Sequence, residues 1–273
     1  MKDTLSKGTI YLLLSLGAVL MLLPFIWMIS SSLKASYEVA SMPPVWVPTN
    51  PRWENYTDAM AIAPFDRFFW NSLIVAVLGL IGELLTTVLA AYAFSKMNFW
   101  GKNVIFTILL ATMMVPSEVL LIPNFVTISN LGWVDRFAAL IVPWTASVFS
   151  IFLVRQHFMK IPKQLSYAAK IDGCGDFRFL WTVMVPLTKP ALITMSLLTT
   201  INSWNAFLWP LLVTNRVEMR TLPVGLAAFR GEAGTVYELL MAASVMVILP
   251  MVILFFLMQK HIVSGVSRGG IKG

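Results

Sequence analysis

The sequence predicts an all-α polytopic membrane protein with six transmembrane helices. Of its 273 residues, 58% are hydrophobic and 12% are charged, whereas soluble domains average about 45–50% and 25%. A helix needs about 20 apolar residues to cross roughly 30 Å of hydrocarbon. A transmembrane β-barrel is not expected, because the apolar runs are continuous rather than alternating. The runs lie at 10–32, 70–94, 104–125, 137–156, 191–213 and 238–259.

The first apolar run has an alternative interpretation as a cleaved signal peptide, since Lys2 and Lys7 precede it and SSSLKAS follows it. Its apolar stretch exceeds the roughly 7–15 residues of a usual signal peptide, so we expect it to stay as a membrane anchor. No long polar stretch remains that would form a soluble core. Residues 1–273 are therefore predicted to be a single membrane domain.

The distribution of Lys and Arg predicts that both termini are cytoplasmic. With the N-terminus inside, 13 of the 20 basic residues fall on the cytoplasmic side, as the positive-inside rule requires. The formal net charge of +7 is thus a signal of topology. Because the basic residues are scattered over short loops and form no single face, we do not expect nucleic-acid binding.

The sequence offers little for catalysis, and no enzyme activity is expected of this chain. His157 and His261 lie far apart and Cys174 is alone, so neither a disulfide nor a zinc cluster of known spacing is predicted. The nearest approach to a phosphate-binding loop, FWGKN at 99–103, lacks the upstream glycine and the hydroxyl residue. We expect no cofactor in this chain, so ATP, if it drives the protein, binds to another chain.

A polar patch between the fourth and fifth runs predicts two short helices joined by a glycine turn. Pro162 suits the first turn of a helix, and Gly173 suits the left-handed position after its end, so 162–172 is predicted to be helical. Gly175 and Asp176 favour the start of a second helix. In that helix, Phe177, Leu180 and Met184 are expected to share a face.

Local physics leaves two uses for this helix pair. An apolar-faced pair fits a groove on a partner protein, because Ala168 and Ala169 permit close approach while the charges fix the register. The alternative is an amphipathic loop that lies on lipid headgroups.

The stretch YAAKIDGCGDFRFLWTVMVPLTKPAL at 167–192 resembles the E-A-A-x-x-D-G-x(9)-P signature of membrane subunits of binding-protein-dependent ATP-binding cassette (ABC) importers. Tyr167 stands where the family usually has glutamate. The resemblance implies that the segment at about 160–186 is a cytoplasmic coupling segment that contacts an ATPase subunit. The positions that correspond to the signature are Ala168, Ala169, Asp172, Gly173 and Pro186, with twelve residues rather than nine between Gly173 and Pro186.

Other stretches resemble the maltose-permease branch that imports carbohydrates. The resemblance implies the smaller, six-span permease subunit of the cytoplasmic (inner) membrane. It also implies these partners: a second, larger permease subunit, two ATPase subunits that bind ATP and Mg, an extracytoplasmic solute-binding protein and a sugar substrate. The stretches are WVPTNPRWENY at 46–56, MMVPSEVLLIPNF at 113–125, NSWNAFLWPLLV at 202–213 and the tail QKHIVSGVSRGGIKG.

Glu83 and Glu118 are carboxylates in the interior of the apolar runs. Glu118 lies between Pro116 and Pro123, where a broken backbone and a charge are tolerated when they face a cavity or another protein segment. There it is a candidate acceptor for sugar hydroxyls, and the alternative is that it stays hydrated near the outer surface. Glu83 lies deeper in its run, and we expect it to take a packing role or an interhelical hydrogen bond.

The fifth run combines amides with indoles. Asn202 and Asn205 are candidates for bonding sugar hydroxyls, and Trp204 for covering the apolar face of a sugar. The alternative is an interfacial aromatic belt with amides that join helices, which suits Trp209 best. In maltose-type systems the larger subunit supplies most sugar contacts, so the resemblance implies that this chain lines the route while contributing little affinity.

The two outer segments, 34–69 and 214–236, are either ordinary loops or, by the resemblance, docking surfaces for the solute-binding protein. The second carries Arg216, Glu218, Arg220, Arg230 and Glu232. A permease subunit of an ABC importer is the function expected of the chain. A secondary transporter and a membrane-embedded enzyme or scaffold are the alternatives.

Overall fold

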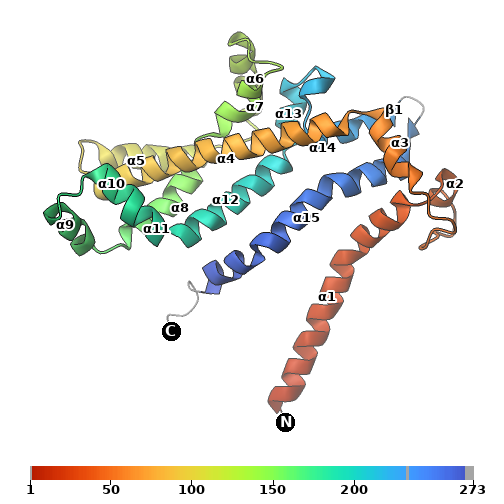
Figure 1. The fold of residues 1–273 in the computed structure, drawn as a ribbon, viewed down its shortest axis with the longest axis horizontal. Helices are drawn as coiled ribbons and strands as arrows, with labels where there is room; N and C mark the ends of the chain where they lie inside the picture. Colours follow the sequence, from red (N-terminus) through yellow and green to blue (C-terminus); the bar gives the residue numbers. More distant parts are fainter. Residues whose placement is uncertain (1, 232–233, 268–273) are drawn as a thin grey trace. The chain divides into compact units, whose positions relative to one another are not determined.

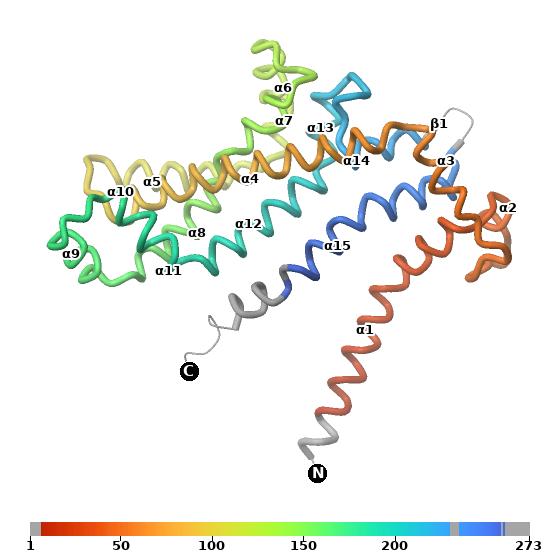
Figure 2. Tube along the Cα trace, in the orientation of Figure 1, coloured from red at the N-terminus to blue at the C-terminus, as the bar shows by residue number. Residues whose placement is uncertain are grey.

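The computed structural model describes residues 2–231 and 234–267, and it is all-α apart from one very short hairpin (Figure 1). The described chain packs as two compact units. Unit 1 consists of Met1–Asp66 and Val224–Val252, and unit 2 of Arg67–Pro223 and Ile253–Gly273. The trace in Figure 2 follows the chain through both units. Glu232 and the end of the tail, 268–273, lie outside the described residues, as does the side chain of Arg230.

Unit 1 is built on one long helix and a connected set of short elements. Its elements are α1 (Lys2–Ser32), α2 (Ser36–Val39), α3 (Glu54–Ile62), a 3₁₀ turn (Leu226–Phe229), β1 (Arg230–Gly231) paired antiparallel with β2 (Gly234–Thr235), and the first part of α15 (Tyr237–Ser267). None of the apolar window of α1 is buried within the protein. A helix that is apolar all round and unburied by its own chain is typical of a membrane span.

The segment that follows α1 is held by buried polar groups. Lys34 is fully buried, and its ammonium lies 3.8 Å from the centre of the Trp27 ring. The side-chain amide of Asn55 donates to the carbonyls of Ser32 and Lys34. Glu38 accepts hydrogen bonds from the backbone amides of Ala35 and Thr49. The predicted outer segment 34–69 therefore has a defined internal structure.

Unit 2 contains most of the remaining helices, and α4 is the longest of them. Its elements are α4 (Phe65–Lys96), α5 (Lys102–Thr112), α6 (Leu121–Asn130), α7 (Phe137–Ile141), a 3₁₀ turn (Val142–Trp144), α8 (Val148–Met159), α9 (Lys163–Ile171), α10 (Asp176–Phe179), a π-helical turn (Leu180–Met184), α11 (Val185–Leu187), α12 (Lys189–Trp204), α13 (Leu208–Val213), a 3₁₀ turn (Val217–Met219) and α14 (Leu222–Gly225).

Within the described residues, three helices are long and apolar enough to span a membrane. They are Lys7–Ser32, Phe65–Lys96 and Tyr237–Leu257. The number rises to at most five if each of two bent helix pairs is one span, which leaves the predicted count of six unconfirmed. The bent pairs are Phe137–Trp144 with Val148–Met159, at 41°, and Asp176–Leu187 with Lys189–Trp204, at 80°.

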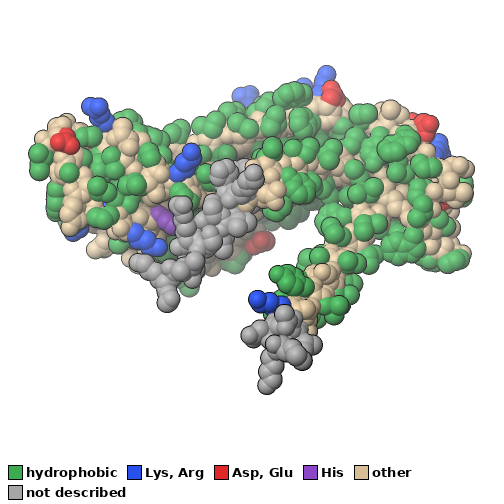
Figure 3. Space-filling view, turned by 60° about the horizontal axis from the view of Figure 1, so that its bottom comes forward, with side chains coloured by type: hydrophobic (Ala, Val, Ile, Leu, Met, Phe, Trp, Pro, Cys, Tyr) green, Lys and Arg blue, Asp and Glu red, His purple; other side chains and the backbone are tan. Residues whose placement is uncertain are grey.

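The predicted third and fifth spans are interrupted. Residues 104–125 form α5, a stretch of turns and α6, because Pro116 cannot donate the backbone hydrogen bond that a continuous helix needs at its position. Residues 191–213 are divided between α12 and α13, and Pro210 lies in the first turn of α13, where a missing N–H is tolerated. Figure 3 shows hydrophobic side chains over most of the face in view, with few Lys and Arg among them.

Candidate functional site

The predicted helix, glycine turn and helix are present in the coupling segment, residues 160–186. The first helix, α9, ends at Ile171, and Gly173 follows with φ of +72°. The amide of Cys174 donates to the carbonyl of Ala169, and that of Gly173 donates to Lys170. These two bonds are the Schellman pattern that ends a helix at a left-handed residue, where glycine has no Cβ penalty.

The signature alanines of α9 face different surroundings. Ala169 packs against a buried core, whereas Ala168 is exposed. Leu165 and Ile171 are exposed as well, Ile171 to 86%. Residues three apart on a helix lie on one face, so Leu165, Ala168 and Ile171 form an apolar surface that the described chain does not cover. Asp172 is exposed at the C-terminal end of this helix.

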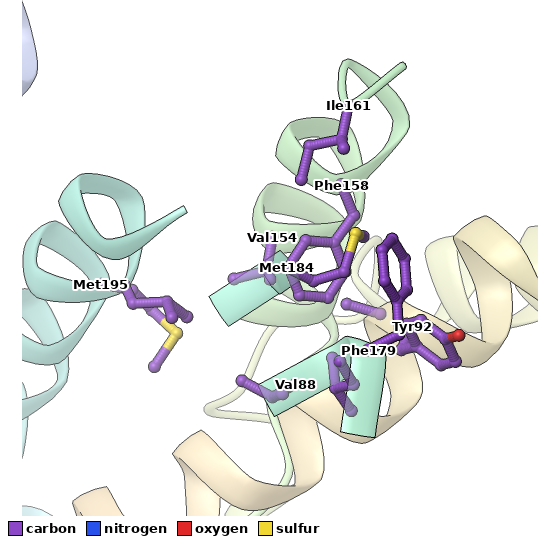
Figure 4. Packing of buried hydrophobic residues seen from close by; sticks show 11 residues of the cluster. Val88, Tyr92, Val154, Phe158, Ile161, Phe179, Met184 and Met195 are labelled. Carbon is purple, nitrogen blue, oxygen red and sulfur yellow. The ribbon is translucent and has the colours of Figure 1, made fainter. Parts of the chain in front are cut away.

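The second half of the coupling segment is built into the core of unit 2 (Figure 4). Phe179, Leu180 and Met184 are almost fully buried against Tyr92 of α4 and Phe158 of α8. The rest of the buried cluster is Val88, Ala91, Val154, Ile161, Leu192 and Met195. Pro186 follows in α11, and its neighbour Val185 packs against the same cluster.

The prediction of which residues form the apolar face of the second helix was wrong for one residue. Leu180 and Met184 are buried as expected, but Phe177 is 69% exposed and Phe179 takes its place. Phe179 and Leu180 are neighbours at the junction of α10 and the π-helical turn at Leu180–Met184, and both are buried in the same cluster. Phe177 lies instead edge-to-face against Trp181.

Two hydrogen bonds link the coupling segment to α4. The hydroxyl of Tyr92 donates to Asp176 Oδ1 over 3.1 Å. The ammonium of Lys96 donates to the carbonyl of Ile161 over 2.8 Å. The C-terminal end of α4 therefore contacts the coupling segment just before α9 and at the first residue of α10.

Unit 2 also contains a cavity of about 950 Å³ that is open on one side. This volume lies at the upper end of the range for small-molecule sites. Glu118 and Asn202 line the cavity, so two of the predicted substrate-path residues lie in one place. Helices α4, α6, α8 and α12 contribute to the wall, together with the connections beside them. Hydroxyl side chains are frequent in it: Ser72, Ser117, Ser147, Ser150, Thr199, Ser203 and Thr221.

The other two predicted substrate-path residues are not among the lining side chains. Trp204 is buried, with its ring edge-to-face against Phe69 at 6.0 Å. Asn205 is the exposed residue that ends α12. Trp204, two positions beyond Asn202, points away from the face of α12 that Asn202 occupies. Asn205 lies just past the end of the helix.

Glu83 forms the expected interhelical hydrogen bond and also lines the cavity. The hydroxyl of Ser150, on α8, donates to Glu83 Oε1 over 2.6 Å. Glu83 is 5% exposed. Sequence reasoning did not assign this residue to the substrate path, because a single carboxylate in an apolar run carries no motif. The signal that would have pointed to it is the pair Ser147 and Ser150, small hydroxyls placed one turn apart in another apolar run.

The backbone break before α8 lies beside Glu83. Thr86 donates its hydroxyl to the carbonyl of Thr145, and the Cα of Gly82 lies so near to Thr145 that an added Cβ would be 2.6 Å from its Cγ2. Trp144 packs edge-to-face against Trp209, whose indole donates to the carbonyl of Ala139. The interruption between α7 and α8 is thus fixed on both sides, and it brings Trp144 and Ser147 to the cavity wall.

Comparison with known proteins gives consistent relatives. The arabinooligosaccharides transport system permease protein AraQ of Bacillus subtilis (strain 168) is 35% identical over 260 residues, which cover 94% of this chain and 92% of AraQ. The sulfoquinovosyl glycerol transport system permease protein SmoH of Agrobacterium fabrum is 36% identical, covering 92% and 89%. The sn-glycerol-3-phosphate transport system permease protein UgpE of Brucella suis is 31% identical, covering 93% and 94%.

A solved structure supports the same assignment. A chain of a bacterial ABC transporter involved in the import of the acidic polysaccharide alginate matches with a TM-score of 0.85 and 27% identity, covering 95% of this chain and 97% of that one. The family model for the inner membrane component of binding-protein-dependent transport systems matches residues 83–268, which include the coupling segment and the cavity-lining residues from Glu83 onward. The chain therefore belongs to the family of binding-protein-dependent transport system inner membrane components, the permease subunits of ABC importers.

Proposed function

We propose that this permease subunit passes a carbohydrate or a sugar derivative through the unit 2 cavity into the cytoplasm. The observation that carries the proposal is the cavity wall, where Glu118, Asn202 and the serine and threonine hydroxyls offer hydrogen bonds beside the indoles of Trp144 and Trp209. Polar groups that fix orientation within a mostly apolar wall are typical of small-molecule sites. The names of the relatives, which include arabinooligosaccharides and sulfoquinovosyl glycerol, support this cargo class.

The chain works in an assembly. We propose that it pairs with a second, larger permease subunit above two ATPase subunits, which bind the ATP and Mg, while a solute-binding protein delivers the cargo. A solved structure with the same fold contains a bacterial alginate ABC transporter with its periplasmic protein bound to an alginate pentasaccharide. The excess of Lys and Arg supports our proposal that both termini and the coupling segment lie in the cytoplasm.

The exposed surface of α9 is the proposed contact with an ATPase subunit. It combines Leu165, Ala168 and Ile171 with the charges of Lys170 and Asp172 at the helix end. The buried half of the segment packs on α4, α8 and α12. A displacement of α9 by a closing ATPase would therefore reach the helices that line the cavity, and the ATPase must bind the two permease conformations with different affinity for such coupling to work.

The test of the cargo route compares two asparagines of the same helix region in the complete complex. Asn202→Leu removes an amide from the cavity wall and should reduce carbohydrate uptake, whereas Asn205→Leu changes an exposed residue outside the wall and serves as the matched control. Both variants should assemble with the ATPase subunits. Equal uptake by the two variants for every sugar that the purified solute-binding protein retains would count against this route.

A further inference from the structure

The cavity in unit 2 has a one-sided charge. Two carboxylates, Glu83 and Glu118, are in its wall, and none of the described lining side chains is Lys, Arg or His. Arg220 is next in sequence to the lining residue Thr221 but is not itself in the wall. The excess of negative charge in the wall affects whether a neutral or a charged cargo is favoured, which the proposed function does not specify.

The deeper carboxylate is held in place by its neighbours. Glu83 is 5% exposed and Ser150 donates to its Oε1 over 2.6 Å. Gly82 and Thr86, on either side in sequence, contact Thr145 across the helix break. A hydrogen-bond acceptor is therefore fixed at the cavity wall, as recognition of a ligand hydroxyl requires.

An anionic ligand would meet a poor environment there. A charge that leaves water needs a charged or hydrogen-bonding partner in compensation, and this wall offers a carboxyl or carboxylate where a phosphate, sulfonate or uronate would need a cation. A neutral sugar has only hydroxyls, which donate to carboxylate and amide oxygens at little cost. Discrimination against the wrong ligand by an unpaired or like charge is a general route to specificity.

We propose that this cavity selects uncharged, hydroxyl-rich carbohydrate over anionic carbohydrate, and that Glu83 and Glu118 are its specificity-determining residues. The proposal rests on the proposed function for its physiological meaning, since it names the charge class of that same cargo. Its electrostatic part concerns the cavity alone and can be tested without any cargo.

The first experiment measures the charge preference of the cavity in the complete complex in lipid nanodiscs. Thr199→Cys places a thiol in the wall with little change of shape. The probes are a cationic trimethylammonium-ethyl and an anionic sulfonato-ethyl methanethiosulfonate, and peptide mass spectrometry reads the modified site so that Cys174 can stay. Thr57→Cys, exposed in unit 1, is the reference site.

The rate ratio of cationic to anionic reagent at residue 199 should exceed that at residue 57. A carboxylate in the same wall attracts the cationic reagent and repels the anionic one, so Glu83→Gln or Glu118→Gln should lower the ratio at 199 and leave it unchanged at 57. Glu118 is exposed, so Glu118→Gln gives a readout even if Glu83→Gln assembles poorly. The proposal would be overturned by any of three results: a ratio at 199 that is no higher than at 57, a ratio at 199 that neither substitution changes, or no reaction of either reagent at 199.

The second experiment connects the charge to transport. Uptake by proteoliposomes is compared for arabinotriose, maltotriose and galactotriose and for the reducing-end aldonate of each. The same solute-binding protein serves wild type and variants, so its own preference cancels when the neutral-to-aldonate ratios are compared. We expect this ratio to fall several-fold in Glu83→Gln and Glu118→Gln. An unchanged ratio overturns the inference, whereas no uptake of any sugar retained by the solute-binding protein contradicts the proposed function and leaves the thiol result to decide the inference.

Discussion

The hydroxyl of Tyr92 donates a hydrogen bond to the carboxylate of Asp176, and this contact joins the last turn of the long helix α4 to the first residue of α10. Tyr92 itself is buried against Phe179 and Phe158 in the cluster that holds the coupling segment. One residue thus contributes both packing and a directional contact at the place where α4 and the coupling segment meet.

Tyr92→Phe should loosen this junction without emptying the core, because the ring remains and only the hydroxyl is lost. We expect a loss of about 0.5–1.5 kcal/mol in the stability of the permease and less sugar transported per ATP hydrolysed. Asp176→Asn is the matched control, since its side-chain oxygen still accepts the bond. Uptake and hydrolysis measured together check this, and a Tyr92→Phe complex with the coupling ratio of wild type would show that the bond plays no part in coupling.

Gly173→Val should disrupt the end of α9. At φ of +72° a β-branched residue is strongly disfavoured, and the Schellman bonds of Cys174 and Gly173 depend on that conformation. Gly175→Ala is the control: Gly175 has φ of −71°, and nothing lies within 4 Å of an added Cβ. We expect Gly173→Val to insert in the membrane but to lose ATPase subunits or transport, with a milder effect in the same direction for Asp172→Ala.

Co-purification of the ATPase subunits, sugar-stimulated hydrolysis and uptake together decide this prediction. Gly173→Asn should keep more function than Gly173→Val, because asparagine tolerates the left-handed region better than other residues with a Cβ. Normal values of all three measurements for Gly173→Val would mean that the coupling segment is only a surface loop.

Gly82→Ala should destabilise unit 2, although alanine normally favours a helix over glycine by about 0.5–1 kcal/mol. The new Cβ would lie 2.6 Å from Thr145 Cγ2 and 3.1 Å from its Cβ, so α4 and the helix break must separate. We expect a net loss of about 1–3 kcal/mol, as for other overpacked sites. Gly79→Ala, one turn earlier with nothing within 4 Å, should be neutral or stabilising.

Thermal unfolding of the purified complex gives the comparison. Thr145→Ser removes the clashing methyl and keeps the hydroxyl, so the double variant should recover part of the loss. If Gly82→Ala melts with wild type or above it, the close approach of the two segments is not a constraint on the fold.

Glu38 makes the stability of the segment after α1 dependent on pH. Hydrogen bonds from Thr49 and Ala35 hold the pKa of the Glu38 carboxyl below its usual value. A group whose pKa is lowered by folding adds stability above its unfolded pKa, and this stability is lost as the pH falls through the folded pKa. We therefore expect the segment 34–63 to open more readily as the medium is acidified below the usual range of glutamate.

Hydrogen exchange of residues 34–63 at several acidic pH values measures this opening. In Glu38→Gln the acid dependence should become smaller, and the segment should be less protected at neutral pH because the amide accepts weaker hydrogen bonds than the carboxylate. Glu54→Gln, at an exposed position, is the control. If the acid dependence of exchange is the same in wild type and Glu38→Gln, groups other than Glu38 cause it.

The elements that were predictable from the sequence are those whose cause is local. Gly173 needs only its own backbone conformation to end α9, whereas Pro162, expected in the first turn of that helix, is the residue just before it. The long helices follow from their apolar composition, because membrane spanning requires little else. The family signature adds the expectation that the coupling segment contacts an ATPase subunit.

The features that escaped prediction depend on contacts between distant segments. Glu83 lines the cavity because Ser150, 67 residues away, fixes its carboxylate, and no pattern near Glu83 encodes that pairing. Phe179 is buried and Phe177 is exposed, because the core that α4 and α8 present lies on the side of α10 that Phe179 occupies. Trp204 and Asn205 were grouped with Asn202 by sequence proximity, which takes no account of where α12 ends.

The opposite surroundings of Ala168 and Ala169 have a practical consequence. The methyl group of Ala169 lies against the protein's own core, while that of Ala168 lies on the open apolar face of α9. A larger side chain at 169 would disturb the folding of the segment. The same side chain at 168 would leave the segment folded and change only the surface that it offers to another molecule. Two adjacent positions in one dipeptide thus separate the folding of the coupling segment from its recognition by another chain.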